Sequence, residues 1–215
     1  MWLVASSVVT EVPRERVRDV RRFNAPVQLA VAAAHEVATH AVVPAEAALI
    51  SLAPCQSGSP ELHKWIRDIS TESGGSVKVN PTHTLHAVDN LALSVFSIAL
   101  RNRAWAMSLG GAAGMFWTAL ELVLERDERE VIVLAGDQVS GVDASPAVGV
   151  AMLFAREPYA DRPRLLAVER QRAQGQPTPH AAAGAIAMLA DLRDAYRVPA
   201  PHGDGFDDIV VRWAR

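Results

Sequence analysis

Cysteine is nearly absent from this sequence, since Cys55 is the one cysteine among 215 residues. A disulfide within the chain is therefore excluded, and so is a metal site built on several thiolates. Long apolar runs are also missing, because Asp89, Asn90 and Arg101 interrupt the best candidate for a membrane span. Residues 1–9 lack the basic flank of a signal peptide and resemble a first strand. We therefore expect a cytoplasmic protein without a membrane span.

Neither sign of charge is in large excess. The net charge is −3 and the sequence pI is about 6.2, so the chain has no general attraction for nucleic acid or for an anionic membrane. Nucleic acid is not an expected partner.

Three motifs of catalysis or cofactor binding are missing. The run beginning His35-Glu36 has Thr39 where a zinc protease motif needs its second histidine. The glycine-rich run 110–114 is not G-x-G-x-x-G, and no G-x-S-x-G surrounds Ser108. His83 and His86 are three residues apart but have no acidic or thiol partner. We expect no metal and no cofactor.

What the chain does contain is enough apolar sequence for one domain. Half of the residues are hydrophobic and 21% are charged, which can fill one core over residues 1–215. The patterns predict the following elements: strands at 2–10, 46–52, 105–109, 131–135, Val148–Ala155, 164–169 and 208–213, helices beginning at Pro26 and Ser59 and spanning 88–100, 115–124 and 180–196, an exposed helix end at 125–130, and loops at 71–79 and 141–146.

The stretch 80–121 organises the rest. It predicts a largely apolar helix, a short strand, and a glycine-rich turn that opens a second buried helix. Such strand-to-helix turns often carry chemistry in α/β proteins. Here the turn has Ala112 and Ala113 between its glycines, and its nearest hydroxyl, on Ser108, lies inside the strand. The turn offers no nucleophile.

The order and spacing of these residues resemble the condensing-enzyme (thiolase-like) superfamily. Within it, the chain is most similar to the short ketosynthase-like family of chain-length factors from aryl-polyene and related polyene pathways. Ketosynthases carry a Ser-Pro, an Asn ten positions later, a Gly-Pro and an active-site Cys, and this chain has at those places Asn80-Pro81, Asn90, Arg103-Ala104 and Ala112. Two of the four are kept, and the nucleophile is lost.

The resemblance covers roughly residues 21–157 and fades afterwards. It implies an α/β fold with a thiolase-like mixed sheet, helices on both faces and an abbreviated second half. Ketosynthases bring two catalytic histidines in that half, of which His180 is a faint echo of one.

The resemblance also implies a role. The chain would be a non-catalytic chain-length-factor subunit that forms a heterodimer with a catalytic ketosynthase, meets acyl carrier protein through that complex, and has no activity alone. It places an acyl pocket or gate at Leu62, Trp65, Ile66, Ile69, His83 and Met115. It places the partner interface at Val88, Asn90, Leu91, Trp105, Ala106, Met107, Ser108 and Leu109.

Other readings of the same residues stay open. Leu62, Trp65, Ile66 and Ile69 form one apolar stripe at helical spacing, which plain core packing also explains. Cys55 follows a predicted strand and could serve a stand-alone acyltransferase or hydrolase. A scaffold without an acyl pocket is a third possibility. The basic run 14–22 is either a solvated connection or a docking patch for an acidic carrier protein.

Overall fold

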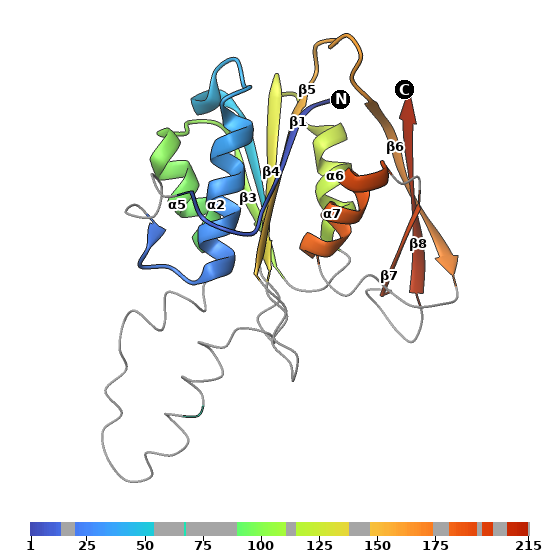
Figure 1. Ribbon diagram of the computed structural model, residues 1–215. Coiled ribbons are helices and arrows are strands. Elements are labelled where there is room, and N and C mark those ends of the chain that lie inside the picture. The colour runs from blue at the N-terminus through green and yellow to red at the C-terminus, as the bar shows by residue number, and fades with distance from the viewer. Residues whose placement is uncertain are drawn as a thin grey trace.

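The computed structural model describes residues 1–13, 20–53, 67, 90–110, 115–137, 147–173, 181–192, 195–199 and 206–214 (Figure 1). Its strands are β1 (Trp2–Val9), β2 (Ala48–Leu52), β3 (Ala106–Leu109), β4 (Glu130–Asp137), β5 (Val148–Ala155), β6 (Arg164–Ala173), β7 (Ala195–Pro199) and β8 (Phe206–Ala214). Its helices are α2 (Ala25–Ala38), the short 3-10 helix η1 (Pro44–Glu46), α5 (Leu91–Leu100), α6 (Met115–Glu125) and α7 (Ala181–Asp191).

Over these residues the strands form one eight-stranded mixed sheet in the order β3-β2-β4-β5-β1-β6-β8-β7. Strand β2 is parallel to both β3 and β4, while β5 runs antiparallel to its neighbours β4 and β1. β1 and β6 pair through Trp2 and Arg164. Beyond that pair the sheet bends, so that β6, β8 and β7 stand apart from the first five strands in Figure 1.

Helices cover both faces of the sheet (Figure 1). α2 and α5 pack on one face, where Ala30, Ala34 and Phe96 are fully buried. α6 and α7 lie between the two arms of the bent sheet. Their apolar residues share one core with Val131 and Val133 of β4 and with residues of β6 and β8. The predicted α/β class, with a mixed sheet between helices, is confirmed.

The sequence of α2 explains its close seat on the sheet. The Asn24 side chain caps the helix by accepting a hydrogen bond from the Val27 amide at 3.3 Å, and Pro26 occupies the first turn. Gly136 and Gly149 on the strands below have no side chain to hold the helix away. A methyl group built on either glycine would lie 2.0 Å from the Pro26 carbonyl oxygen or 2.1 Å from the Leu29 carbonyl carbon.

Two sequence predictions about secondary structure are wrong. The helix expected over 180–196 ends at Asp191, because Leu192 adopts a left-handed conformation (φ 45°) and the chain continues into strand β7. The exposed helix end expected over 125–130 does not include Glu130, which is buried at the start of β4. Its carboxylate accepts hydrogen bonds of 3.0 and 2.9 Å from the Val42 amide.

The other expected elements within the described residues are present, with shifted ends. Strand Val148–Ala155 has the predicted bounds, and β4 and β6 are longer than predicted. The helix expected from Ser59 and the loops at 71–79 and 141–146 lie outside the described residues.

Candidate functional site

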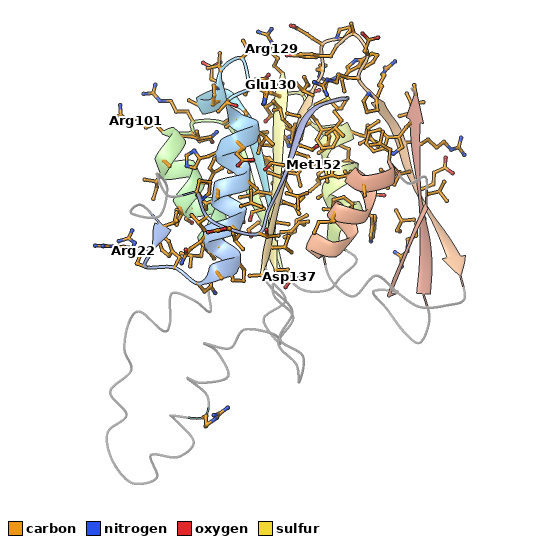
Figure 2. The ribbon with its side chains drawn as sticks, in the orientation of Figure 1. Arg22, Arg101, Arg129, Glu130, Asp137 and Met152 are labelled. Atoms are coloured by element: carbon orange, nitrogen blue, oxygen red, sulfur yellow. The ribbon has the colours of Figure 1, made fainter. Side chains whose placement is uncertain are left out.

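The carboxyl ends of β2, β3 and β4 meet at one edge of the sheet, because the three strands are parallel. The last residues there are Leu52, Leu109 and Asp137, and α6 begins nearby in sequence at Met115. Figure 2 shows Asp137 at this end and Arg129 and Glu130 at the opposite end. In open α/β sheets this is the edge at which ligands and catalytic groups gather.

Few described groups at this edge can do chemistry. Ser51 of β2 is fully buried, and its hydroxyl has no hydrogen-bond partner within the part of the chain that the structure describes. Ser51 lies beside Ser108 in the register of β2 and β3. Asp137 is 2% exposed. The described residues of this edge include no cysteine and no histidine to activate a serine, so they do not form a nucleophile with its base.

Strand β3 ends the sheet on the side of α5. One side of it pairs with β2, and no described strand pairs with its other side. Ala106 is exposed, Met107 is 39% exposed, and Ser108 and Leu109 are half-buried. An apolar strand at the edge of a sheet is a ready site for pairing with another chain.

Helix α5 flanks this edge with one buried and one exposed side. Leu91, Leu93 and Phe96 are buried against the core, whereas Ile98 is 77% exposed. Asn90 precedes the helix and is exposed. The expectation of a helix that is apolar on most sides is confirmed for Leu91–Leu100, and the apolar side that its own chain leaves uncovered includes Ile98.

A groove of about 430 Å³ runs beside that exposed side of α5. It lies between α5, α2 and the turn that precedes α2, with the lining residues Val20, Arg22, Phe23, Val31, His35, Val95, Ile98 and Ala99. The His35 ring stands edge-on to Phe96, with ring centres 5.1 Å apart. The groove and strand β3 thus border the same helix.

Trp105 is held by its own chain at the start of β3. The Arg126 guanidinium lies 4.2 Å from the centre of the Trp105 ring. Arg126 also donates two hydrogen bonds to Glu128, at 2.9 and 2.8 Å, and these bonds lower the pKa of the Glu128 carboxyl. The Trp105 carbonyl accepts from the Leu49 amide at 3.0 Å. This network fixes the position of the strand that follows.

The structure brings together part of the predicted set. Asn90 and Leu91 begin α5, Trp105 leads into β3, and residues 106–109 form β3 itself. Met115 opens α6 and is half-buried against the core that α6 shares with α7. The remaining predicted residues lie outside the described part of the chain: Leu62, Trp65, Ile66, Ile69, His83, Val88, Ala112 and the alternative nucleophile Cys55.

Ser51 and Asp137 are polar groups at this edge that the sequence analysis did not select. The sequence pattern at Asp137, an acid at the end of an apolar strand, could have predicted its position at the carboxyl end of the sheet. Nothing local marked Ser51, because its place beside Ser108 depends on strand register.

The described residues contain neither a candidate metal site nor a candidate membrane span. No group of three or more His, Cys, Asp or Glu side chains there could hold a metal ion. No helix in the described ranges has both the length and the apolar character to cross a membrane.

Comparison with known proteins gives matches in structure. No family model matches the sequence, and no curated protein matches it. Among solved structures, the chain matches the ketosynthase (ApeO) in complex with its chain length factor (ApeC) from Xenorhabdus doucetiae. That match has a TM-score of 0.65 and 15% identity, and covers 95% of this chain and 83% of the other.

Two further matches have the same fold. The ishigamide ketosynthase/chain length factor gives a TM-score of 0.52 and 15% identity over 75% of this chain and 53% of that one. A beta-ketoacyl synthase from Burkholderia phymatum gives a TM-score of 0.51 and 15% identity over 86% and 56%. The chain therefore spans about half the length of these two proteins. The fold is the thiolase-like fold of ketosynthases and chain length factors.

Proposed function

We propose that this chain is a non-catalytic chain-length-factor subunit, which pairs with a catalytic ketosynthase and shapes the pocket for a growing acyl chain. Its nearest folds among those described above come from complexes of ketosynthases with chain length factors. The partner supplies the nucleophile and the histidines, and acyl carrier protein reaches this subunit through the complex.

The observation that carries the proposal is the position of β3 at the edge of the described sheet. Strand β3 ends the described sheet, exposes Met107, and is flanked by a helix with Ile98 exposed. A strand of the partner added along β3 would continue the sheet and cover Met107. Trp105 and its Arg126 contact hold the strand in place, so pairing requires little reordering.

The absence of a nucleophile at the predicted turn supports a non-catalytic role. Claisen condensation needs a nucleophile that holds the acyl group and polar groups that stabilise the developing charge. In sequence, Ala112 stands where ketosynthases carry cysteine. The described residues of the same edge include no cysteine.

The acyl pocket is the finer part of the proposal. The apolar stripe that contains Trp65, together with His83 and Met115, would line the pocket and limit its length. Met115 is the first residue of α6 and follows Ala112 by three positions in the sequence, which fits a pocket wall.

The experiment is co-expression of the tagged chain with a ketosynthase encoded beside it, followed by measurement of the mass of the purified species. We expect a one-to-one complex that Met107→Lys weakens at least about tenfold, because a buried charge replaces an apolar contact. Leu166→Lys is the matched control: Leu166 is 47% exposed and lies on β6, away from β3 in the sheet order.

Two results would overturn the proposal. One is a monomer with no affinity for any ketosynthase. The other is steady condensing activity of the purified chain alone with malonyl-carrier protein.

A further inference from the structure

A second pocket lies at the other end of the sheet. The turn between β5 and β6, the start of β1 and the end of α7 border an open hollow of about 790 Å³, and the described lining residues are Trp2, Pro158, Tyr159, Ala160, Asp161, Arg162, Pro163 and Leu192. The turn is anchored beside Arg129, whose carbonyl accepts from the Arg156 amide at 2.9 Å. Arg129 and Glu130 mark this end in Figure 2, opposite Asp137. The pocket is thus separate from the β3 edge.

The walls of this pocket are flat and stiff. Trp2 and Tyr159 contribute two half-buried aromatic rings, and Pro158 and Pro163 contribute two more rings with few rotatable bonds. The Leu3 amide donates to the Pro163 carbonyl at 2.9 Å, which ties the turn to β1. Pockets for small molecules in proteins have volumes of about 300–1,000 Å³ and mostly apolar walls with a few polar groups. This pocket meets both criteria.

The described lining holds one arginine, Arg162, and one acid, and a second arginine outside the lining adds positive charge. The guanidinium of that residue, Arg164, lies 5.7 Å from the centre of the Trp2 ring. Neither arginine forms an ion pair within the described residues, whereas the neighbouring Arg129 pairs with Glu157 at 2.8 Å. Asp161 is the one acid among the described lining residues. The pocket therefore attracts anions.

The backbone around the pocket is held in an unfavourable conformation. Three non-glycine residues of the described chain have positive φ, and two of them, Asp161 (φ 58°) and Leu192 (φ 45°), line this pocket. The third, Arg101, ends helix α5. A left-handed residue with a side chain costs roughly 1–2 kcal/mol, and such residues gather at ligand-binding and catalytic sites.

We propose that this pocket binds a small anion with a flat apolar body, of the class of aromatic carboxylates. The flat body lies against Trp2 and Tyr159, and the carboxylate faces Arg162. The site does not depend on the proposed pairing with a ketosynthase, because it involves neither β3 nor α5.

The test is isothermal titration of the purified full chain with 2-naphthoate, its neutral analogue 2-naphthalenemethanol and its cationic analogue 2-naphthylmethylammonium. We expect 2-naphthoate to bind about two- to fivefold more tightly than the neutral analogue, which is the range of one partly exposed charge contact. Arg162→Gln should remove most of that difference, and Asp161→Asn should strengthen binding of 2-naphthoate. Arg212→Gln is the matched control, because Arg212 is on β8 and pairs with Glu169.

Two further variants make the test independent of overall stability. Trp2→Leu should weaken 2-naphthoate and the neutral analogue alike, by about tenfold, and a melting curve shows whether the variant is folded. Arg162→Glu changes an exposed side chain and should reverse the preference toward the cationic analogue. Equal affinity for all three ligands, no binding at millimolar concentration, or an unchanged preference in Arg162→Glu would each overturn the proposal.

Discussion

Gly149→Ala is expected to be among the most damaging single methyl additions in this protein. A β-carbon at this position would lie 2.1 Å from the Leu29 carbonyl carbon, 2.2 Å from its oxygen and 2.6 Å from the Ala30 amide nitrogen. All three atoms belong to the backbone of α2, so no side chain can rotate out of the way. Ordinary contact begins near 3.4 Å, so the helix must move by more than an ångström.

This movement would lower the stability of the protein because it separates α2 from the sheet. Ala30, Ala33 and Ala34 are fully buried where α2 packs on the sheet, and a shifted helix loses that packing. Overpacking typically costs about 1–3 kcal/mol, and we expect the upper end or beyond because the obstacle is backbone. For a chain of this length, about 3 kcal/mol lowers the melting temperature by roughly 6–12 °C.

The assay is thermal and urea denaturation of the variant beside the parent chain. Val8→Ala is the control, because Val8 is 47% exposed on the neighbouring strand β1 and its loss should change stability by less than about 0.5 kcal/mol. A melting temperature for Gly149→Ala within 2 °C or so of the parent would refute the claim that α2 rests directly on the backbone of β5.

Three other outcomes are expected. If the Trp65 indole closes the acyl pocket, Trp65→Ala in the reconstituted pair should lengthen the products, with about 0.8 kcal/mol gained per added buried CH₂. If Trp65 is plain core, the product masses should stay unchanged and the variant should lose about 3–5 kcal/mol of stability. Glu121→Gln should stabilise the chain at neutral pH, because burial raises the pKa of Glu121 and so disfavours its ionised form. The difference in stability between variant and parent should shrink at lower pH, where Glu121 of the parent becomes protonated. The Glu128 carboxyl behaves oppositely, because its hydrogen bond with Arg126 lowers its pKa. Its contribution to stability is present above the unfolded pKa and is lost as pH falls through the folded pKa. Arg126→Gln should therefore reduce the loss of melting temperature at acid pH.

Local sequence patterns predicted the regular elements well where nothing distant competed. Val148–Ala155 is bounded by turn residues and was predicted with its observed ends. Asn24 and Pro26 mark the start of α2 because capping is a local effect. The helix over 180–196 was predicted too long, because residues 192–198 contain no glycine or proline and the left-handed turn at Leu192 has no local signal.

Long-range pairing explains what the sequence could not predict. Glu130 closes a charged run that resembles a solvated helix end, yet its carboxylate is buried against the amide of Val42, 88 residues away. Ser51 and Ser108 lie side by side through the register of β2 and β3. Residues 106–109 were assigned to a partner interface by resemblance, and their edge position became visible only with the strand order.

The most direct test of the account is amide hydrogen exchange of residues 106–109, measured in the free chain and in the complex with its ketosynthase. Pairing along the outer side of β3 predicts that the amides facing away from β2 exchange at least about tenfold more slowly in the complex. The opposite edge strand, β7 (Ala195–Pro199), serves as the internal control and should be unchanged. A stable complex in which residues 106–109 gain no protection would contradict the account.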